Sequence, residues 1–254
     1  MKGFVRFSAT LIVFVEAFFY SAGWAEEQKA SSDAGYYAKR GMEFQLNGQS
    51  EEAISDFNKA IEIDPKSVEA YFNRGLAYAQ GEADCEQAIS DFNKVIELDP
   101  THALAYNNRG FLLMNHGEYD QAISDFDRAI AINSKYFRAY YNRGIAWQSK
   151  DQYDRAIADY TAAIEIDPSH ALPYNNRGSA WHLKGRYDQA VMDYNKAIEI
   201  DPGYALAYFN RGVAYLKKGD CDKAWEDFRN VEGMGYQISP ELFEQLRKAC
   251  GEQI

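Results

Sequence analysis

The chain has 254 residues, of which 46% are hydrophobic, and a formal net charge of −11 at pH 7. Its lysine and arginine residues are scattered and form no basic stripe, which argues against a nucleic-acid partner and against docking on anionic lipid. An acidic balance of this kind is typical of a protein that simply stays in solution.

The first 25 residues have the pattern of a secretory signal peptide. Lys2 and Arg6 precede an apolar run over residues 7–20, and a Gly-Trp-Ala cleavage site ends at Ala25. Cleavage there would leave a mature chain without a membrane span.

An uncleaved membrane anchor is the alternative interpretation of this segment. The run is short for a bilayer span and contains Glu16, so we favour cleavage. Residues 26–33 are polar, and we expect them to form a disordered linker.

An Asn-Arg-Gly triplet recurs through the rest of the chain, with steps of 34 residues and one step of 35. The triplets begin at Asn73, Asn108, Asn142, Asn176 and Asn210, and a degenerate first copy begins at Lys39. A period of this length indicates a repeat architecture, in which each repeat is stabilised mainly by its neighbours.

Each repeat has the same spacing of residues around its glycine. An aromatic residue lies four positions before the glycine, and a bulky residue lies three after it. An alanine follows at twelve (thirteen in the second repeat), and a second aromatic lies four beyond the alanine. Spacings of three and four place these groups on one helical face, which predicts two amphipathic helices per repeat. Asp-Pro closes four of the repeats. The proline cannot continue the second helix and therefore ends it.

This pattern resembles the tetratricopeptide repeat family over about residues 34–238. The resemblance implies an all-α, right-handed superhelical solenoid of six helix-turn-helix units, with a concave groove lined by the first helices. The predicted units are residues 34–67, 68–102, 103–136, 137–170, 171–204 and 205–238.

The chain departs from the family at the residue before the glycine, where arginine replaces the usual leucine in every repeat. An aspartate lies on each second helix, at Asp56, Asp91, Asp125, Asp159, Asp193 and Asp227. A planar guanidinium suits bidentate pairing with a carboxylate, so we predict a structural ion pair repeated six times. In the third repeat Asn133-Ser134 replaces Asp-Pro, and we expect a looser helix end there.

A capping helix is predicted over residues 239–254, with Ser239 as its N-cap and Pro240 at its first position. Cys221 begins the last repeat's second helix and Cys250 ends the cap. Because the two helices should be antiparallel, we predict a disulfide between these cysteines. Cys85 lies four repeats away and is a free thiol, a residue at the edge of the core, or an intermolecular link.

The sequence contains no motif that indicates catalysis. The four histidines lack metal-binding spacing, and there is no nucleophile elbow or phosphate-binding loop. We therefore predict a non-enzyme with no cofactor, no metal and no small-molecule substrate.

The predicted groove carries one asparagine per triplet, at Asn73, Asn108, Asn142, Asn176 and Asn210. A carboxamide both donates and accepts hydrogen bonds, so this row could hold a peptide backbone without reading its sequence. The row looks like the asparagine ladder of O-linked N-acetylglucosamine transferase. A purely structural role for these asparagines stays open.

The position before each triplet alternates along the groove. It is aromatic in the second, fourth and sixth repeats, at Phe72, Tyr141 and Phe209, and amide in the third and fifth, at Asn107 and Asn175. Phe111 follows the third glycine, and Arg138 is the cation expected near the groove mouth. Apolar pockets between amide clamps suit an extended or helical peptide.

These features predict an exported adaptor that binds peptide segments of a protein partner, in a bacterial periplasm or as a secreted protein. One alternative is a self-assembling scaffold, in which Cys85 or an apolar end face forms a homodimer. Another is an accessory subunit of an envelope or secretion complex.

Overall fold

The structure is a computed structural model that describes residues 33–80 and 84–250. The predicted signal peptide, the linker up to residue 32, and the last four residues of the predicted cap lie outside the described residues. So does most of the turn that holds the second repeat's extra residue. Within the described ranges every regular element is a helix.

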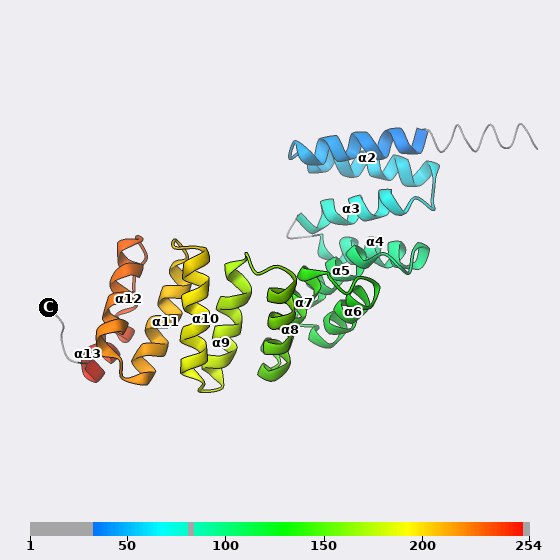
Figure 1. Cartoon of the computed structure of the whole chain (residues 1–254). Coiled ribbons are helices and arrows are strands. Elements are labelled where there is room, and N and C mark those ends of the chain that lie inside the picture. Colours follow the sequence, from blue (N-terminus) through cyan, green and yellow to red (C-terminus); the bar gives the residue numbers. More distant parts are fainter. Residues whose placement is uncertain (1–32, 81–83, 251–254) are drawn as a thin grey trace, which may run out of the picture. The chain divides into compact units, whose positions relative to one another are not determined.

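The helices follow one another in pairs that match the predicted repeats (Figure 1). They are a helix over residues 33–46, α2 (Ser50–Ile63), α3 (Val68–Gln80), α4 (Cys85–Leu98), α5 (Ala103–Asn115), α6 (Tyr119–Ile132), α7 (Phe137–Ser149), α8 (Tyr153–Ile166), α9 (Ala171–Leu183), α10 (Tyr187–Ile200), α11 (Ala205–Lys218), α12 (Cys221–Gly233) and α13 (Pro240–Cys250).

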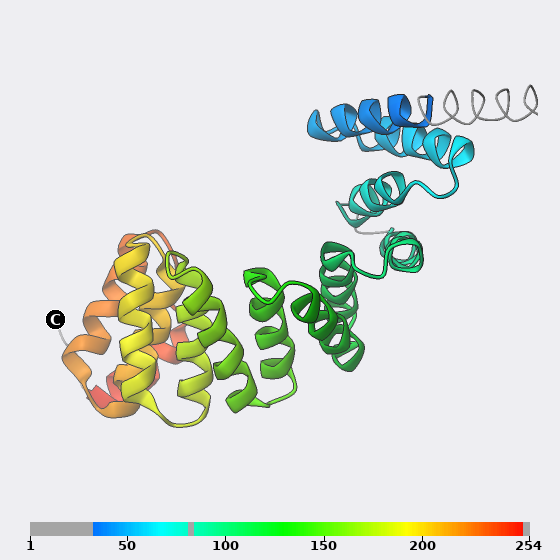
Figure 2. The ribbon, with the colours of Figure 1, turned by 45° about the vertical axis from the view of Figure 1, so that its right-hand side comes forward.

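The contacts divide the chain into two compact bodies, an N-terminal body that ends at Ala105 and a C-terminal body that begins at Tyr106. In the N-terminal body α3 packs on both α2 and α4. In the C-terminal body α7, α9 and α11 each pack on their own second helix and on the second helix of the preceding repeat, as α9 does on α10 and α8. Figures 1 and 2 both show α9 to α12 side by side. This is the packing of a repeat solenoid.

The glycine of each first helix lies against the aromatic ring of its second helix. A Cβ atom added to Gly144 would lie 2.6 Å from Cε1 of Tyr160, so no larger residue fits there without a shift. The rings in this position are fully or almost fully buried: Phe57, Phe92, Phe126, Tyr160, Tyr194 and Phe228. Close approach at the glycine therefore sets the distance between the paired helices.

The turn inside most described repeats contains a residue in the left-handed conformation. Gly117, Gly185 and Gly219 have φ angles of 81°, 72° and 81°. The fourth repeat places Asp151 there instead, with φ 58°, and its carboxylate accepts a hydrogen bond from the Tyr153 hydroxyl at 2.6 Å. Aspartate is one of the few residues other than glycine that tolerates this conformation.

The turn between repeats depends on a side-chain oxygen that accepts a backbone N–H two residues later. Asp64 accepts from Lys66 at 3.0 Å, and Asn133 accepts from Lys135 at 3.1 Å. The expectation of a looser helix end in the third repeat is therefore wrong. The carboxamide oxygen of Asn133 closes the same turn as the carboxylate does elsewhere.

The cap begins as predicted, with Pro240 at the first position of α13 and the Ser239 hydroxyl accepting the Leu242 N–H at 3.3 Å. The Cys221–Cys250 disulfide joins α12 to α13, with 5.4 Å between the Cα atoms. Leu246 is buried in a cluster with Trp225. Cys85 is unpaired and partly exposed among the described residues.

Candidate peptide-binding face

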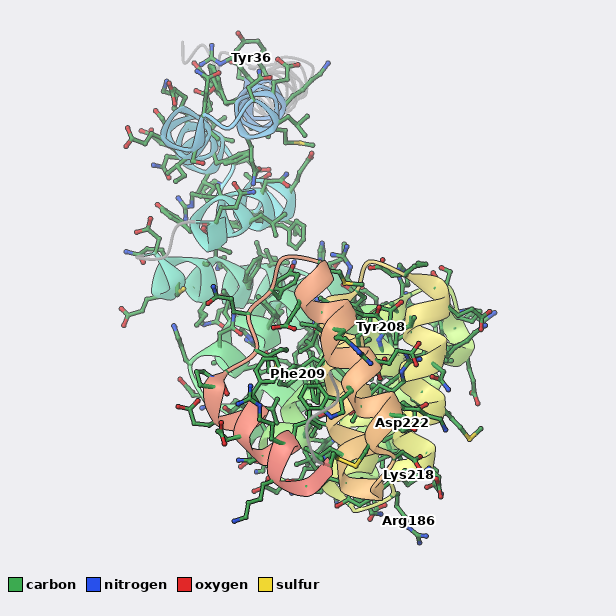
Figure 3. All side chains as sticks on the ribbon, turned by 90° about the vertical axis from the view of Figure 1, so that its left-hand side faces the viewer. Tyr36, Arg186, Tyr208, Phe209, Lys218 and Asp222 are labelled. Atoms are coloured by element: carbon green, nitrogen blue, oxygen red, sulfur yellow. A yellow bond between two sulfur atoms is a disulfide. The ribbon has the colours of Figure 1, made fainter. Side chains whose placement is uncertain are left out.

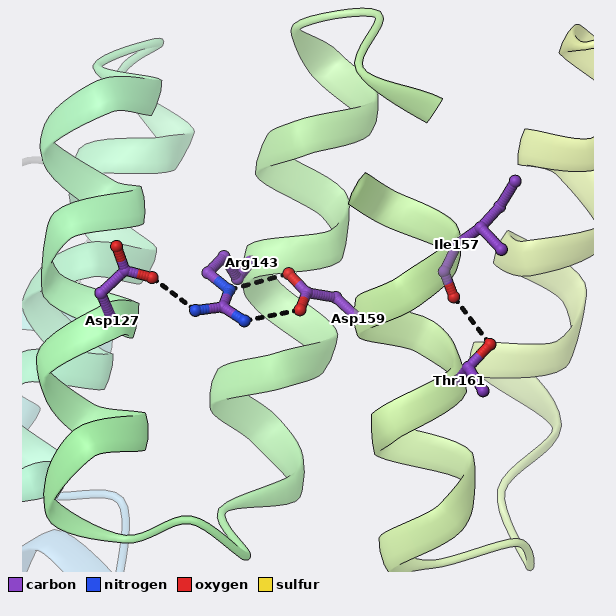
Figure 4. Close-up of polar contacts among 5 residues, drawn as sticks. All are labelled: Asp127, Arg143, Ile157, Asp159 and Thr161. Atoms are coloured by element: carbon purple, nitrogen blue, oxygen red, sulfur yellow. Dashed lines mark hydrogen bonds and ion pairs between the residues drawn. The ribbon is translucent and has the colours of Figure 1, made fainter. Parts of the chain in front are cut away.

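The predicted Arg–Asp pair is present in every repeat and forms what we call the Arg–Asp row. Its members are Arg40–Asp56, Arg74–Asp91, Arg109–Asp125, Arg143–Asp159, Arg177–Asp193 and Arg211–Asp227. In Figure 4, Nε and Nη2 of Arg143 donate to Asp159 at 2.8 and 2.6 Å, while Nη1 donates to Asp127 on α6 of the preceding repeat. Arg74, Arg177 and Arg211 likewise donate from Nη1 to the second helix of the preceding repeat, so these arginines join two successive second helices. The prediction of structural ion pairs is confirmed.

The aspartates of the row are buried and its arginines are partly exposed, and burial acts on both partners of the Arg143–Asp159 pair. Burial by itself would lower the pKa of Arg143, but the hydrogen bonds to Asp159 and Asp127 outweigh it, so the pKa is raised and the guanidinium stays charged. Burial raises the pKa of Asp159 against the hydrogen bonds from Arg143. The bidentate hydrogen bonds from the charged guanidinium oppose this shift and favour the ionised carboxylate. Both groups are already engaged, so we assign the row no part in ligand binding.

Three triplet asparagines of the C-terminal body, Asn142, Asn176 and Asn210, donate hydrogen bonds to the preceding repeat. Nδ2 of Asn142 donates to Oδ1 of Asn107 at 3.1 Å, and Nδ2 of Asn210 donates to Oδ1 of Asn175 at 3.0 Å. Each bond spans 35 residues of sequence and ties two neighbouring first helices together. These asparagines thus have a structural role that the sequence alone had left open.

Asn107 and Asn175 do not face the groove, contrary to the sequence-based prediction. Their exposed fractions are only 3% and 2%, because the next repeat covers them. Each also donates to its own neighbour, Asn107 to Asn108 at 3.4 Å and Asn175 to Asn176 at 3.2 Å. The alternation of amide and aromatic residues at this position was the signal that could have identified them.

In the fourth repeat an aromatic hydroxyl takes the place of the buried amide. Nδ2 of Asn176 donates to the Tyr141 hydroxyl at 3.0 Å. Burial raises the pKa of Tyr141, so its hydroxyl stays protonated. The resulting hydrogen-bonded set, here called the amide ladder, comprises Asn107, Asn108, Tyr141, Asn142, Asn175, Asn176 and Asn210.

The amide ladder keeps unused hydrogen-bonding capacity. Among the described residues, no side chain or backbone group donates to Oδ1 of Asn142 or Asn210, and each Nδ2 has a second hydrogen. A carboxamide held on one side by its neighbour has lost much of its rotational freedom. Such fixed groups suit the backbone of a bound peptide.

The remaining predicted site residues fall in different places. Phe72 and Asn73 lie in the N-terminal body, where the Phe72 ring lies 4.7 Å from that of His102. In the C-terminal body, Phe111 is 42% exposed on α5 and Arg138 is exposed in the first turn of α7.

A pocket of about 430 Å³, here called the terminal pocket, lies at the last repeat. Its walls are formed by Asp201, Gly203, Tyr204, Ala205, Leu206, Phe209, Val231, Tyr236 and Gln237. Phe209, the predicted groove residue labelled in Figure 3, belongs to it. The sequence analysis missed Leu206 and Tyr236, although both are half-exposed apolar residues. Leu206 was detectable, because it lies three residues before Phe209 on the same helical face.

Family models support the architecture over most of the described chain. Models of the tetratricopeptide repeat match residues 68–102, 103–136 and 137–170, and a related TPR repeat model matches residues 41–81 and 182–219. The chain belongs to the tetratricopeptide repeat family, whose fold is a scaffold for protein–protein interaction.

Individual proteins are similar to this chain over part or most of their own length. An uncharacterized protein of Methanocaldococcus jannaschii is 48% identical over 44 residues, and the match spans about half of that protein (51%) and 17% of this chain. The solved structure of MamA is 33% identical, with 65% of this chain and 96% of MamA covered and a TM-score of 0.61. YrrB, described as a TPR protein with an unusual peptide-binding site, is 24% identical, with 76% and 96% covered and a TM-score of 0.62.

Residues 33–80 and 84–250 lack two further features. No helix among them is both long and apolar enough to span a bilayer. Nor do they contain a cluster of three or more histidine, cysteine, aspartate or glutamate side chains arranged to hold a metal ion.

Proposed function

We propose that this protein is a non-enzymatic, exported adaptor that binds peptide segments of a partner protein along the first helices of its C-terminal body. The main support for this proposal is the amide ladder. Its side chains are held in place by their own hydrogen bonds, and Oδ1 of Asn142 and of Asn210 accepts no hydrogen bond from the described residues. Exposed apolar side chains, Phe111 and Leu172 among them, lie on the same set of helices. Fixed amides with apolar contacts between them suit an extended or helical peptide. The peptide-binding site named for YrrB is consistent with this proposal.

Export is supported by two separate features. The first 25 residues have the composition of a signal peptide. The Cys221–Cys250 disulfide is a kind of bond that persists in oxidising compartments. Fractionation of the source cells, with thiol labelling of the protein before and after reduction, tests both together. A reduced, cytosolic protein would refute the export half of the proposal.

Site-specific photo-crosslinking tests the binding half in the native compartment. A photoreactive residue is placed at Phe111 or Leu172 on first helices, and at Met192 on the second helix α10 as a matched control. All three residues are apolar and exposed. We expect a crosslinked partner from Phe111 and Leu172 and none from Met192.

The other outcomes are equally informative. Equal crosslinking from all three positions would place the partner elsewhere than on the first helices. A product at twice the mass of the chain would favour the self-assembling scaffold. No product at any position would refute the adaptor.

A further inference from the structure

We propose that the terminal pocket anchors a basic-apolar peptide segment, taking one apolar side chain into the cavity and holding a neighbouring lysine or arginine beside Asp201. This inference rests on the proposed function and specifies the chemistry of the peptide at the last repeat.

The cavity has the size and lining of an anchor site. Its volume of about 430 Å³ lies within the roughly 300 to 1,000 Å³ usual for ligand pockets. Phe209 and Val231 belong to its walls, and the Phe209 ring packs 5.8 Å from that of Phe228, which is fully buried. Leu206 and Tyr236 are 50% and 60% exposed. An apolar side chain entering here would cover surface that the chain itself leaves in water.

The pocket exists because the last repeat is followed by a cap and not by another repeat. Four residues separate α10 from α11, whereas six separate α12 from α13. At the earlier junction, Ala207 of α11 is fully buried against Ala197 and Tyr174 of the preceding repeat. At the end of the chain, Tyr236 and Gln237 of the longer connection line the cavity instead. The longer connection to the cap therefore supplies part of the wall of this opening.

The negative charge of Asp201 determines which type of peptide residue fits beside the apolar anchor. Asp201 is the charged member of the wall, and none of the described lining residues is lysine or arginine. One carboxylate oxygen of Asp201 accepts the Gly203 N–H at 2.9 Å, and the other is available to a cation. The Tyr204 and Tyr236 rings also belong to the wall, and aromatic faces attract a cation within about 6 Å. A lysine or arginine beside the anchor therefore fits, while a carboxylate there would be repelled.

The test uses three fluorescein-labelled decapeptides with a glycine-serine background. The first contains Lys-Leu-Lys-Phe at its centre, the second replaces both lysines with glutamate, and the third replaces leucine and phenylalanine with alanine. Binding to the mature protein is measured by fluorescence anisotropy at low ionic strength. We expect the first peptide to bind at least about tenfold more tightly than either of the others.

Two pocket variants are each compared with a matched control in an earlier repeat. Leu206→Ser is compared with Leu104→Ser, because the two leucines are 50% and 48% exposed at equivalent positions, and Leu104 lies in the N-terminal body, outside the pocket and the proposed binding face. Asp201→Asn is compared with Asp167→Asn. Asn133 shows that asparagine can close this turn, so the change removes the charge and keeps the backbone conformation.

For the first peptide we expect Leu206→Ser to weaken binding about tenfold and Asp201→Asn about threefold, with much smaller changes in both controls. Equal losses in variants and controls, or no binding by the first peptide, would overturn the pocket assignment. Neither result would affect photo-crosslinking from Phe111 and Leu172, so the proposed function is tested separately. Circular dichroism confirms that each variant is folded.

Discussion

The Arg–Asp row and the amide ladder both include side chains of the first helices, yet they differ in regularity. The row has the same two residue types in all six repeats, and every aspartate in it is buried. The ladder changes from one repeat to the next, with Asn107 and Asn175 replaced by Tyr141 in the repeat between them. A group that serves packing alone faces the same surroundings in each repeat, so its residue type stays the same. A surface that binds a partner faces different surroundings along its length, so its residue types can differ from one repeat to the next.

The two sets also differ in what is left over after the internal contacts are made. In the row, the arginines of the fourth and sixth repeats use Nε and both terminal nitrogens on neighbouring side chains. In the ladder, Nδ2 of Asn142 and Nδ2 of Asn210 each donate to one other described residue. The Oδ1 atom of each accepts no hydrogen bond from the described residues. The row is therefore structural, and the ladder combines a structural role with hydrogen-bonding groups that its internal contacts do not use.

The largest effect is expected from breaking the row at its centre. Arg143→Ala should lower the free energy of unfolding by about 4 kcal/mol, because it leaves Asp159 buried without its cation. Urea unfolding followed by circular dichroism measures this. Arg138→Ala, at an exposed position, should change stability by less than about 0.5 kcal/mol. Equal effects of the two changes would show that the row is not what holds these repeats together.

The next largest loss of stability should come from removing the Cys221–Cys250 disulfide, which links the last repeat to the cap. Replacing Cys221 and Cys250 together by serine opens a link between residues 29 apart in sequence, which should cost about 3.5 kcal/mol. The loss should concentrate at α12 and α13, where hydrogen exchange would show lower protection. Cys85→Ser is the control. A uniform loss of protection along the whole chain would contradict a local role for the disulfide.

A smaller loss should follow from Gly144→Ala. Alanine normally stabilises a helix interior relative to glycine, but here its Cβ would lie 2.6 Å from the Tyr160 ring. We expect a net loss of about 2 kcal/mol, measured as a lower urea midpoint. The double variant Gly144→Ala with Tyr160→Leu should recover part of it. An increase in stability in the single variant would mean that the paired helices separate easily.

The smallest effect should come from the ladder, and it sharpens the comparison most. Asn142→Ala removes the donor to Oδ1 of Asn107, which is buried, and should cost about 1.5 kcal/mol. Asn73→Ala is the control, because the residue 35 positions before it is Ala38, which has no polar side chain. That change should cost less than about 0.5 kcal/mol. Equal stability of the two variants would remove the structural role of the ladder.

The sequence by itself determined the architecture, because period, helical spacing and turn residues act locally. The glycine-aromatic spacing, the Asp-Pro turns and the serine-proline start of the cap each act within a few residues of their own position. The Arg–Asp pairs and the disulfide were also predictable, since antiparallel helix pairs fix which residues face each other. Among the turns, Asn133 was misjudged, because the same turn accepts an oxygen from either an amide or a carboxylate.

Only the tertiary structure decided which amide groups of the ladder pair with a neighbouring repeat and which do not. Whether Asn107 faces a peptide or its own neighbour depends on how far the next repeat overlaps it, and that distance is set by packing between repeats. The terminal pocket likewise depends on where the cap settles after a six-residue connection. This connection is not part of the 34-residue repeat. The sequence pattern that predicts the repeats therefore does not predict where the cap lies on the last of them.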